Sequence, residues 1–534
     1  MTEPRADYII VGAGSAGCVL AERLSADPNV TVLLIEAGSD VASAMVPIPM
    51  GIGRTLADPA LTSYFTTESD PGTGNKPTMW LRGRGLGGSS AINGMIYCRG
   101  HPQDYDDWQA AGCDGWGWTE MGRIFRAMED HELGPGEERG TGGPLHISIQ
   151  RHRSALTEAI LDGCTALGVP RVDDPNVPRL DAIGYTPATI RRGRRVSART
   201  AFLDRARGRP NLTILTDRSV DRIAWRGRRA TGVIDAHGRR YAASREVILS
   251  AGSLVSPLIL QRSGIGPAGL LERHGIELVR HAPGVGAHLR EHKIVAMTLR
   301  LKSGLSHNRR LRGLPLLFEG ARYALTRGGV LATTYDLNGF IRTDPALDRP
   351  DAQITFWSLS WQRDAATMMT EAEPGMSVMG YPCRTDSEGS VEIRSADSAD
   401  PPIIRTNFLS TEHDRRIIVG IQRFMRRLFA LPEVACHIVA ETWPGVDVQS
   451  DAAILDAARQ DSTCMHATGT CHMGAGDEAV LDTRLRVRGV DGLRVVDCSV
   501  FPTQVSGNTN GPVMAVAWRA AELIAEDRRR TDTR

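Results

Sequence analysis

The sequence predicts an α/β fold in which a largely parallel sheet with helices on its faces carries an inserted α+β domain built on an antiparallel sheet. Three observations predict this architecture. The first 40 residues read as strand, glycine turn, helix and strand. Segments typical of antiparallel strands dominate residues 295–455, and after residue 456 the chain returns to glycine-rich turns, a short strand and an apolar helix.

A length of 534 residues exceeds what one hydrophobic core usually serves, so we expect two domains. We assign residues 1–150, 190–294 and 456–534 to the discontinuous parallel-sheet domain. Residues 151–189 and 295–455 form the inserted domain.

Composition narrows the function classes. A net charge of +1 gives no overall attraction to nucleic acid or to an anionic membrane, although it leaves room for a local basic patch. The N-terminus has no signal-peptide pattern, and no stretch approaches the roughly 20 apolar residues of a membrane helix, so we expect a cytoplasmic protein. Nine cysteines are scattered singly, and although Cys464 and Cys471 flank His466 and His472, we predict neither a disulfide framework nor a metal site.

The first elements form one βαβ unit. Asp7–Val11 is a short apolar strand, Gly12–Gly17 is a turn, Ala16–Ser25 has a helical pattern, and Val30–Ile35 is a continuous apolar run typical of a buried parallel strand. Such a unit is the basic element of Rossmann-like nucleotide-binding domains.

The turn in this unit has the spacing of a dinucleotide-binding fingerprint. Gly12 permits the tight turn, Gly14 lets the backbone approach a pyrophosphate, and Gly17 lets the helix pack on the strand. Glu36 ends the next strand, 24 residues after Gly12, where a carboxylate accepts hydrogen bonds from ribose hydroxyls. The fingerprint alone does not separate FAD from NAD.

A second glycine-rich segment runs from Arg82 to Met95 and contains five glycines. We interpret it as a second concavity lined by backbone, which suits a ligand longer than a mononucleotide, such as FAD.

The other elements follow in order. Strands are expected at 212–215, 220–224, 232–235 and 246–250, and helices at 256–263, 410–430 and 451–460. Ile294–Leu301, Ala352–Phe356 and Ser390–Arg394 are predicted strands of the antiparallel sheet. A strand at Leu493–Val496 and a helix from Pro512 to Glu526 complete the fold, and we expect the tail after Glu526 to be frayed.

Two C-terminal segments carry polar side chains suited to chemistry. The first, Ser462–Gly474, contains His466 and His472, and the second runs from the strand at 493–496 through Asp497 to Pro512. In the second segment a loop of small polar residues leads into an apolar helix, whose N-terminus can face an electron-rich ring and stabilise negative charge on it.

Together these motifs resemble the glucose–methanol–choline (GMC) oxidoreductases, and the resemblance covers almost the whole chain. Beyond the fingerprint, the second glycine segment and the two C-terminal segments, it rests on these stretches: Glu36–Gly38, Arg99–Gly100, Ser250–Ser253, Ser256–Pro257, Ser263–Gly266 and Pro283–Gly286.

The resemblance implies an FAD-dependent enzyme with a Rossmann-like FAD-binding domain and a substrate-binding domain on the antiparallel sheet. Matching positions assign these residues to the cofactor: Gly12, Gly14, Ser15, Ala16, Glu36 and Ala37 to the ADP part; Val220 to the adenine; Arg84, Gly87, Gly88, Ser89, Asn93, Gly94 and Met95 to the ribityl chain and flavin ring; and Ala251, Asp497, Cys498, Asn508 and Thr509 to the remaining contacts. Ile92 stands where some relatives attach FAD covalently through a histidine, so we predict non-covalent FAD.

The resemblance also implies the catalytic pair. His466 matches the active-site histidine beside flavin N5, and Asn508 matches its partner. An alcohol must lose its hydroxyl proton as its α-hydride leaves for N5, so His466 would act as base and Asn508 would orient the substrate. We therefore expect oxidation of a primary alcohol, aromatic or aliphatic, to its aldehyde, with oxygen or a quinone-type carrier as electron acceptor.

Candidate walls of the substrate pocket are Trp357, Trp361, Met465 and Phe340. Aromatic walls favour an apolar or aromatic alcohol, and choline is not favoured because no acid–aromatic cluster stands out. The family's Asn-Leu-Gln-Asp-His pattern is changed here to His288–His292, which would affect a loop near the flavin. The segment Arg309–Leu325 mixes arginines with apolar residues. Three interpretations are open for it: an active-site lid, a helix that touches a membrane, or an ordinary surface helix.

Other functions stay open at this point. The same family resemblance includes flavin-dependent lyases and a light-driven fatty acid decarboxylase, and Cys383 with Arg384 keeps the latter open. An NAD-dependent dehydrogenase and a non-catalytic nucleotide-binding protein are further alternatives, which the flavin-type segments and His466 disfavour.

Overall fold

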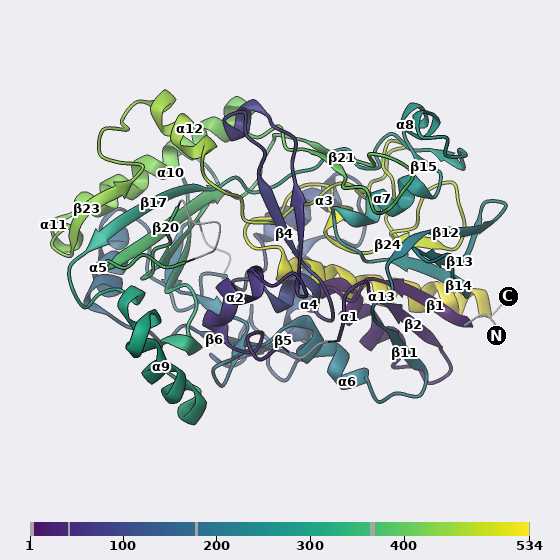
Figure 1. Cartoon of the computed structure of the whole chain (residues 1–534), viewed down its shortest axis with the longest axis horizontal. Coiled ribbons are helices and arrows are strands. Elements are labelled where there is room, and N and C mark those ends of the chain that lie inside the picture. Colours follow the sequence, from purple (N-terminus) through teal and green to yellow (C-terminus); the bar gives the residue numbers. More distant parts are fainter. Residues whose placement is uncertain (1–4, 41–42, 177–179, 364–368, 533–534) are drawn as a thin grey trace.

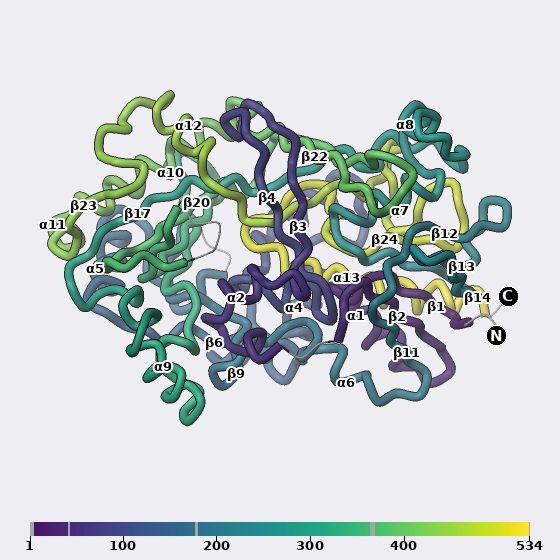
Figure 2. The backbone as a smooth tube through the Cα atoms, viewed as in Figure 1, coloured from purple at the N-terminus to yellow at the C-terminus, as the bar shows by residue number. Residues whose placement is uncertain are grey.

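The computed structural model describes residues 5–40, 43–176, 180–363 and 369–532. Two large sheets lie towards opposite ends of an elongated molecule (Figure 1), a seven-stranded one and a six-stranded one. The colours of the backbone tube show that the purple start and the yellow end of the chain both belong to the same half (Figure 2). The half built on the six-stranded sheet is formed mainly by the middle of the chain.

The seven-stranded sheet has a parallel centre, as the apolar runs predict. Its order is β11-β2-β1-β14-β13-β12, with β24 pairing with β14. The pairs β11–β2, β2–β1, β1–β14 and β14–β24 are parallel, whereas β12 and β13 join as an antiparallel extension. The bounds are β1 (Arg5–Val11), β2 (Val32–Ile35), β11 (Leu212–Leu215), β12 (Val220–Arg226), β13 (Arg229–Asp235), β14 (Arg240–Leu249) and β24 (Leu493–Val495).

The carboxyl ends of the parallel strands gather at one edge of this sheet. Gly12 follows β1, Glu36 follows β2, Ser250 follows β14, and Asp497 lies two residues beyond β24. In parallel sheets with helices on both faces this edge is the usual place for a ligand. The fold thus brings together four of the sequence motifs.

Helix α1 (Ser15–Leu24) leads from the glycine turn back along the sheet, and its inward side is lined by small and aliphatic residues. It packs against α13 (Asn510–Asp532), which is apolar over most of its length. A Cβ atom at Gly17 would lie 1.9 Å from the carbonyl oxygen of Gly12, so only glycine lets α1 approach the turn this closely.

The six-stranded sheet is antiparallel, as expected of the inserted domain. Its order is β23-β17-β20-β19-β18-β7. The bounds are β7 (Ala182–Tyr185), β17 (Val295–Leu301), β18 (Leu337–Ile341), β19 (Ala352–Trp357), β20 (Gly375–Pro382) and β23 (Ile438–Trp443).

The two faces of this sheet differ. Ile354, Phe356 and Val378 point to the face covered by α10 (Glu412–Ala430), where they join an apolar core. Side chains alternate along a strand, so Gln353 and Trp357 point to the opposite face. Tyr381 lies directly opposite Gln353 on β20, which adds it to the same polar and aromatic face.

Smaller elements connect the two halves. A hairpin of β3 (Thr62–Thr66) and β4 (Met79–Gly83) stands between them and precedes the second glycine segment (Figure 1). The remaining helices are α2 (Ile52–Leu56), α3 (Pro102–Ala110), α4 (Trp118–Met128), α5 (Ala155–Ala166), α6 (Asp204–Ala206), α7 (Val255–Arg262), α8 (Ala268–Arg273), α9 (Gly313–Thr326), α11 (Pro432–Ala435) and α12 (Asp451–Arg459). The remaining strands are β5 (Glu129–His131), β6 (Leu145–Ile149), β8 (Pro187–Ala188), β9 (Ile190–Arg191), β10 (Arg194–Arg195), β15 (Ile265–Gly266), β16 (Arg280–His281), β21 (Ser390–Glu392) and β22 (Ile403–Arg405).

The predicted antiparallel strand at Ser390–Arg394 forms, but it lies outside the six-stranded sheet. This segment forms β21, which pairs only with β22 in a separate two-stranded sheet. The side chain of Gln261 on α7 explains the difference. Its amide donates to the carbonyl oxygen of Val391 (3.1 Å) and accepts from the N–H of Ile393 (2.8 Å), which holds β21 beside α7.

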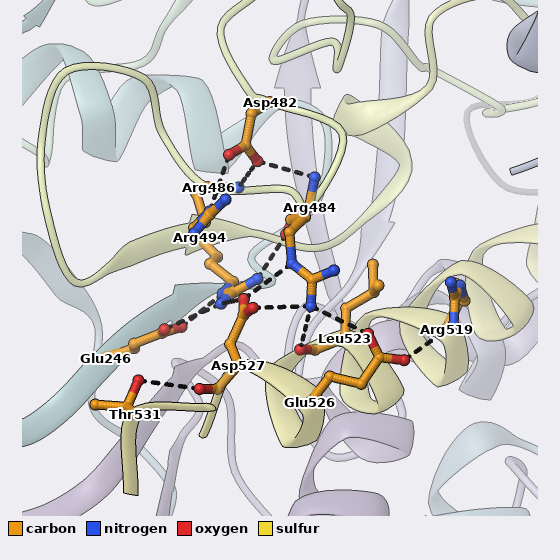
Figure 3. A network of polar contacts seen from close by, with 10 residues as sticks. All are labelled: Glu246, Asp482, Arg484, Arg486, Arg494, Arg519, Leu523, Glu526, Asp527 and Thr531. Carbon is orange, nitrogen blue, oxygen red and sulfur yellow. Dashed lines mark hydrogen bonds and ion pairs between the residues drawn. The ribbon is translucent and has the colours of Figure 1, made fainter. Parts of the chain in front are cut away.

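The expectation of a frayed tail after Glu526 is wrong, because α13 continues to Asp532. Figure 3 shows the reason. The buried Arg494 guanidinium binds Glu246 (2.6 Å) and Asp527 (2.7 Å). Arg484 also donates to the carbonyl oxygen of Leu523 (2.9 Å), so the last turns of α13 are tied to the sheet. Residues 533–534 of the predicted tail lie outside the described residues.

Within the described part of the chain, no helix combines the length and apolar character needed to cross a bilayer.

Candidate active site

The glycine turn after β1 is packed on one side and open on the other. Gly12 has φ +99°, and a Cβ there would lie 2.5 Å from the carbonyl oxygen of Ser250. A Cβ at Gly14 would meet no atom within 4 Å, so space is open beside its backbone. This space lies at the N-terminus of α1, where no side chain caps the free N–H groups. Free N–H groups and the helix dipole favour a phosphate at this position.

The second glycine segment packs directly on this turn. A Cβ at Gly88 would lie 2.7 Å from the Cα of Gly14, and the N–H of Gly87 donates to the carbonyl oxygen of Ala13 (2.8 Å). The two concavities that the sequence predicts are therefore one continuous site, which suits a long dinucleotide better than two separate ligands.

Glu36 holds the loops of this site together. Its carboxylate accepts from the N–H groups of Ala13 (2.7 Å), Gly38 (2.8 Å) and Gly85 (3.0 Å). Burial raises the pKa of Glu36, and these three N–H groups oppose that effect. A carboxylate offers about four lone-pair positions, so Glu36 keeps the capacity to accept from a ribose hydroxyl as well.

Two helix N-termini meet beside these loops. The hydroxyl of Ser15, the first residue of α1, donates to the side-chain oxygen of Asn510, the first residue of α13 (2.7 Å). Each N-terminus carries partial positive charge, so the pair forms one electropositive region suited to the pyrophosphate and to an electron-rich ring.

Five other predicted cofactor residues lie near Glu36, on the second glycine segment or at the start of α1. Ala37 accepts, through its carbonyl oxygen, from Arg84 (3.1 Å), and Ser89 accepts from the N–H of Gly83 (3.1 Å). Val220 is buried two residues after Arg218, whose N–H donates to the carbonyl oxygen of Glu36 (3.0 Å). Ala16 is buried in the first turn of α1.

The next group continues towards the antiparallel sheet. The side-chain oxygen of Asn93 accepts from the N–H of Met95 (3.1 Å) and from Arg195 (2.8 Å). Met95 is buried and has φ +62°. A Cβ at Gly94 would lie 2.9 Å from the ring of Tyr335, so the loop passes close under this aromatic side chain.

Asp497 lies at the carboxyl edge of the parallel sheet, but its carboxylate is already hydrogen-bonded to other protein groups. It accepts from the N–H of Gly252 (2.9 Å), the hydroxyl of Ser256 (2.6 Å) and the N–H of Ser499 (2.8 Å). The N–H of Ala251, another predicted cofactor residue, donates to the same Ser256 hydroxyl (3.1 Å). Burial raises the pKa of the Cys498 thiol to about 12, and Thr509 is its hydrogen-bond partner. The side chains of Asp497 and Ser256 therefore hold the loops around them in place. A cofactor at this edge would bind to backbone N–H groups rather than to these side chains.

His466 and Asn508 meet although they lie 42 residues apart. The amide nitrogen of Asn508 is 3.2 Å from Nε2 of His466. On the other side of the ring, Nδ1 of His466 is 2.9 Å from Nδ1 of His292. Isolated bridges pair Arg290 with Thr468 and Lys293 with Thr463, which brings the two histidine loops side by side.

A backbone carbonyl determines the tautomers in this chain. Nε2 of His292 lies 3.0 Å from the carbonyl oxygen of Cys383, which can only accept, so His292 carries its proton on Nε2. Nδ1 of His292 is then an acceptor, and His466 must donate to it from Nδ1. Nε2 of His466 is therefore left with a lone pair, directed at the Asn508 amide.

Burial keeps both imidazoles neutral. It lowers the pKa of His292 to about 3 and the pKa of His466 well below its usual value, with the neighbouring His292 and Arg82 adding to the effect on His466. At neutral pH, Nε2 of His466 is thus unprotonated, and its lone pair accepts from the Asn508 amide.

The orientation of Asn508 is also constrained. Its side-chain oxygen accepts from the thiol of Cys98 (3.3 Å) and from the amide of Gln353 (3.1 Å). Gln353 donates as well to Asn338 on the neighbouring strand β18 (2.6 Å). These contacts turn the Asn508 N–H groups towards His466, and they connect the C-terminal segment to the polar face of the antiparallel sheet.

The predicted pocket residues divide into two groups. The ring of Trp357 lies 4.4 Å from that of Tyr335 and 5.5 Å from that of Trp361, and these rings pack with Ile52 and Leu359. Phe340 is half-buried opposite Gln353, on the same face of the sheet.

Met465 lies elsewhere. Its sulfur accepts from the N–H of Leu81 on β4 (3.4 Å), so it packs against the hairpin rather than with the tryptophans.

Sequence reasoning missed several side chains around His466. Glu291 and His292 were mentioned only as part of the segment His288–His292, in which Glu291 departs from the family pattern and His292 keeps its histidine, and that match was the available signal. Glu291 accepts from the N–H of His466 (2.7 Å), and its other oxygen lies 3.7 Å from Arg82, where both atoms are buried without a hydrogen-bond partner. Burial raises the pKa of Glu291 to about 7. The ring of Tyr381 stacks on His292 with centroids 4.7 Å apart.

One group of metal-ligand type occurs elsewhere among the described residues. Possible ligand atoms of His152, His307 and Asp336 lie within 4.8 Å of one another. Both oxygens of Asp336 are already engaged, with His152 (3.1 Å) and with the N–H of Ser358 (2.6 Å). The group thereby ties the start of β18 to its neighbouring loops.

Comparison with known proteins agrees with this geometry. The GMC oxidoreductase family models match residues 6–294 and 385–517. Mitochondrial choline dehydrogenase of Mus musculus is 37% identical over 97% of this chain and 89% of its own length. Alcohol dehydrogenase [acceptor] of Pseudomonas putida is 34% identical over 97% of this chain and 95% of its own length.

A solved structure also matches over almost the whole chain. Pyridoxine 4-oxidase from Mesorbium loti superposes with a TM-score of 0.87 at 31% identity, covering 98% of this chain and 99% of its own. The matches span both sheets and both C-terminal segments, so the α/β fold with an inserted antiparallel-sheet domain is confirmed. The chain belongs to the GMC oxidoreductase family.

Proposed function

We propose that this chain binds FAD non-covalently and oxidises a primary alcohol to its aldehyde. The observation that carries the proposal is the neutral imidazole of His466, whose unprotonated Nε2 faces the amide of Asn508. Names of relatives support an alcohol as donor, since they include choline dehydrogenase and alcohol dehydrogenase [acceptor].

The loops at the edge of the parallel sheet fit FAD. The open space beside Gly14, at the N-terminus of α1, would hold the pyrophosphate. The second glycine segment, which contacts this turn through Gly88, would hold the ribityl chain. Glu36 would accept from the ribose. Ile92 is buried at the position where covalent attachment would need a histidine, which supports non-covalent binding.

The bound flavin would supply the hydride acceptor. The protein's own part is proton transfer and orientation. Nε2 of His466 accepts the hydroxyl proton of the alcohol, while the N–H of Asn508 hydrogen-bonds the same oxygen and positions it. His292 receives the Nδ1–H of His466 and so maintains the lone pair on the reacting side.

The substrate would lie between this pair and the aromatic rings. Trp357, Trp361 and Tyr335 form an apolar wall on the same side of the antiparallel sheet as Gln353, which favours an alcohol with an aromatic or aliphatic body. The electron acceptor would be oxygen or a quinone-type carrier. The domain division at residues 150, 189, 294 and 455 is part of this proposal.

The test is anaerobic stopped-flow absorbance of the purified protein mixed with aromatic, aliphatic and quaternary-ammonium alcohols. Bleaching of a yellow protein by one class supports the proposal and names the donor, and the rate at which air restores the colour separates an oxidase from a dehydrogenase. A colourless protein, or a yellow one that no alcohol bleaches, contradicts it.

The decarboxylase alternative gains no support from its own residues. Arg384 binds the hydroxyl of Ser506 (2.7 Å) and the carbonyl oxygen of Pro350 (2.7 Å), so its guanidinium is already engaged. The carbonyl oxygen of Cys383 is the acceptor that orients His292.

A further inference from the structure

Helix α9 has its polar side inward and its apolar side outward. It projects from the substrate-domain end of the molecule, at the lower left of Figure 1. Its two buried residues are Glu319 and Tyr323. Amphipathic helices of globular proteins normally show the opposite arrangement, with the apolar side on the core.

Polar contacts hold the inward side. The guanidinium of Arg310 donates to Glu319 (2.8 Å), and Glu319 also accepts from the N–H of Val330 (3.3 Å). The hydroxyl of Tyr323 donates to the carbonyl oxygen of Gly193 (2.9 Å). The helix is thus anchored without using its leucines.

The outward side is a continuous apolar stripe. Leu314, Leu317, Phe318 and Leu325 are 71%, 69%, 75% and 85% exposed. With Ala321 they stand at positions i, i+3, i+4, i+7 and i+11, which lie on one face of a helix. Four large apolar side chains in one exposed stripe are typical of a surface that binds another molecule or a membrane.

Basic residues surround this stripe. Arg309 precedes the helix, Arg322 borders the stripe, and Arg327 follows it, all exposed. Exposed Arg192 and Arg194 flank Gly193, the residue that Tyr323 contacts. The helix's own acid, Glu319, is buried and paired with Arg310.

We propose that α9 docks this protein on an anionic membrane surface, with its leucines and Phe318 inserted among the lipids and its arginines on the headgroups. Apolar stripes flanked by arginine bind such interfaces through buried apolar area and electrostatic attraction together. A second copy of the chain fits less well, because an isologous contact would bring the same arginines face to face. The lid alternative would require the apolar side of α9 to face the protein.

Docking through α9 would place the substrate pocket beside the bilayer. Leu311, just before α9, packs with Trp357 and Trp361 in the pocket cluster. An apolar alcohol or a lipid-soluble electron acceptor would then reach the site from the membrane. The docking itself does not depend on the proposed reaction.

The test is flotation of the FAD-loaded protein with vesicles of phosphatidylcholine, with and without phosphatidylglycerol. We expect binding to the anionic vesicles that weakens as salt is raised. Leu317→Glu/Phe318→Glu should reduce the partition coefficient about 10- to 100-fold through lost apolar insertion. Arg309→Glu/Arg322→Glu should reduce it about tenfold or more.

Matched controls lie far from α9. Leu278→Glu changes an exposed leucine near α8, and Arg226→Glu/Arg228→Glu reverses exposed charges at the β12–β13 turn, so neither should alter flotation. All these side chains are exposed, and unchanged melting temperatures would confirm folding. Absence of anionic-vesicle binding, equal loss in the controls, or a dimer in light scattering that only Leu317→Glu/Phe318→Glu dissolves would each overturn the proposal.

Discussion

Replacing His292 should slow flavin reduction even though we do not expect this residue to touch the substrate. In His292→Phe, the ring still stacks on Tyr381, but Nδ1–H of His466 loses its acceptor and the carbonyl oxygen of Cys383 loses its donor. The Nδ1 tautomer and the ring orientation of His466 are then no longer enforced.

The magnitude follows from the lost hydrogen bond. A buried donor left without a partner costs about 1–3 kcal/mol. At about 1.4 kcal/mol for each factor of ten, a mid-range cost corresponds to roughly 30-fold fewer molecules with His466 ready to accept a proton. The limiting rate of flavin reduction should fall by about that factor, while FAD content stays unchanged.

The assay is anaerobic stopped-flow reduction at saturating alcohol for His292→Phe and His292→Asn. In His292→Asn, the amide oxygen at position 292 can accept from Nδ1–H of His466 near the former Nδ1 position, so this variant should recover most of the rate. A normal rate in a folded His292→Phe, or no difference between the two variants, would refute the reasoning.

Three further results are expected. Gly88→Ala should abolish FAD retention on gel filtration, because its Cβ would lie 2.7 Å from the Cα of Gly14, whereas Gly208→Ala, with no atom within 4 Å, should keep it. The contribution of His292 to stability should fall as pH drops below about 6.5, because His292 has a native pKa of about 3 and therefore binds its proton mainly after unfolding, whereas Glu291, whose pKa burial raises to about 7, contributes in the opposite sense. The His292 contribution should change by about 2 kcal/mol between pH 7 and 5, measured as the difference between urea-unfolding profiles of the unchanged protein and His292→Phe, and two profiles with the same pH dependence would contradict it. Trp361→Ala should raise KM for an aromatic alcohol about tenfold with little change in the limiting rate, whereas a lower rate at unchanged KM would place Trp361 outside the pocket wall.

Local patterns predicted most of the parallel-sheet half. The strand Asp7–Val11, the glycine turn and the strand ending before Glu36 are contiguous in sequence, so their periodicity and spacing describe one unit. The same holds for 212–215, which the structure reproduces as β11 with identical bounds. Misassignments occurred where a distant side chain decides the outcome, as Gln261 does for β21 and Arg494 does for the end of α13.

The site shows the same limit more sharply. His466 and Asn508 were singled out because their segments match a family pattern, but no local feature indicates that His292, 174 residues before His466, supplies its acceptor. Gln353 is equally hidden, since its contact with Asn508 depends on the register of β18, β19 and β20. Such contacts follow from tertiary packing, which a single sequence does not show.

The central claim is that His466 accepts the substrate proton, and His466→Ala tests it most directly. The measurement is the anaerobic rate of flavin reduction by the best alcohol, with FAD affinity measured on the same preparation. We predict a rate lower by about 10²–10⁴-fold with FAD affinity changed only slightly, as expected for loss of a general base. An unchanged rate, or a loss of bound FAD that accounts for the whole effect, would contradict the account.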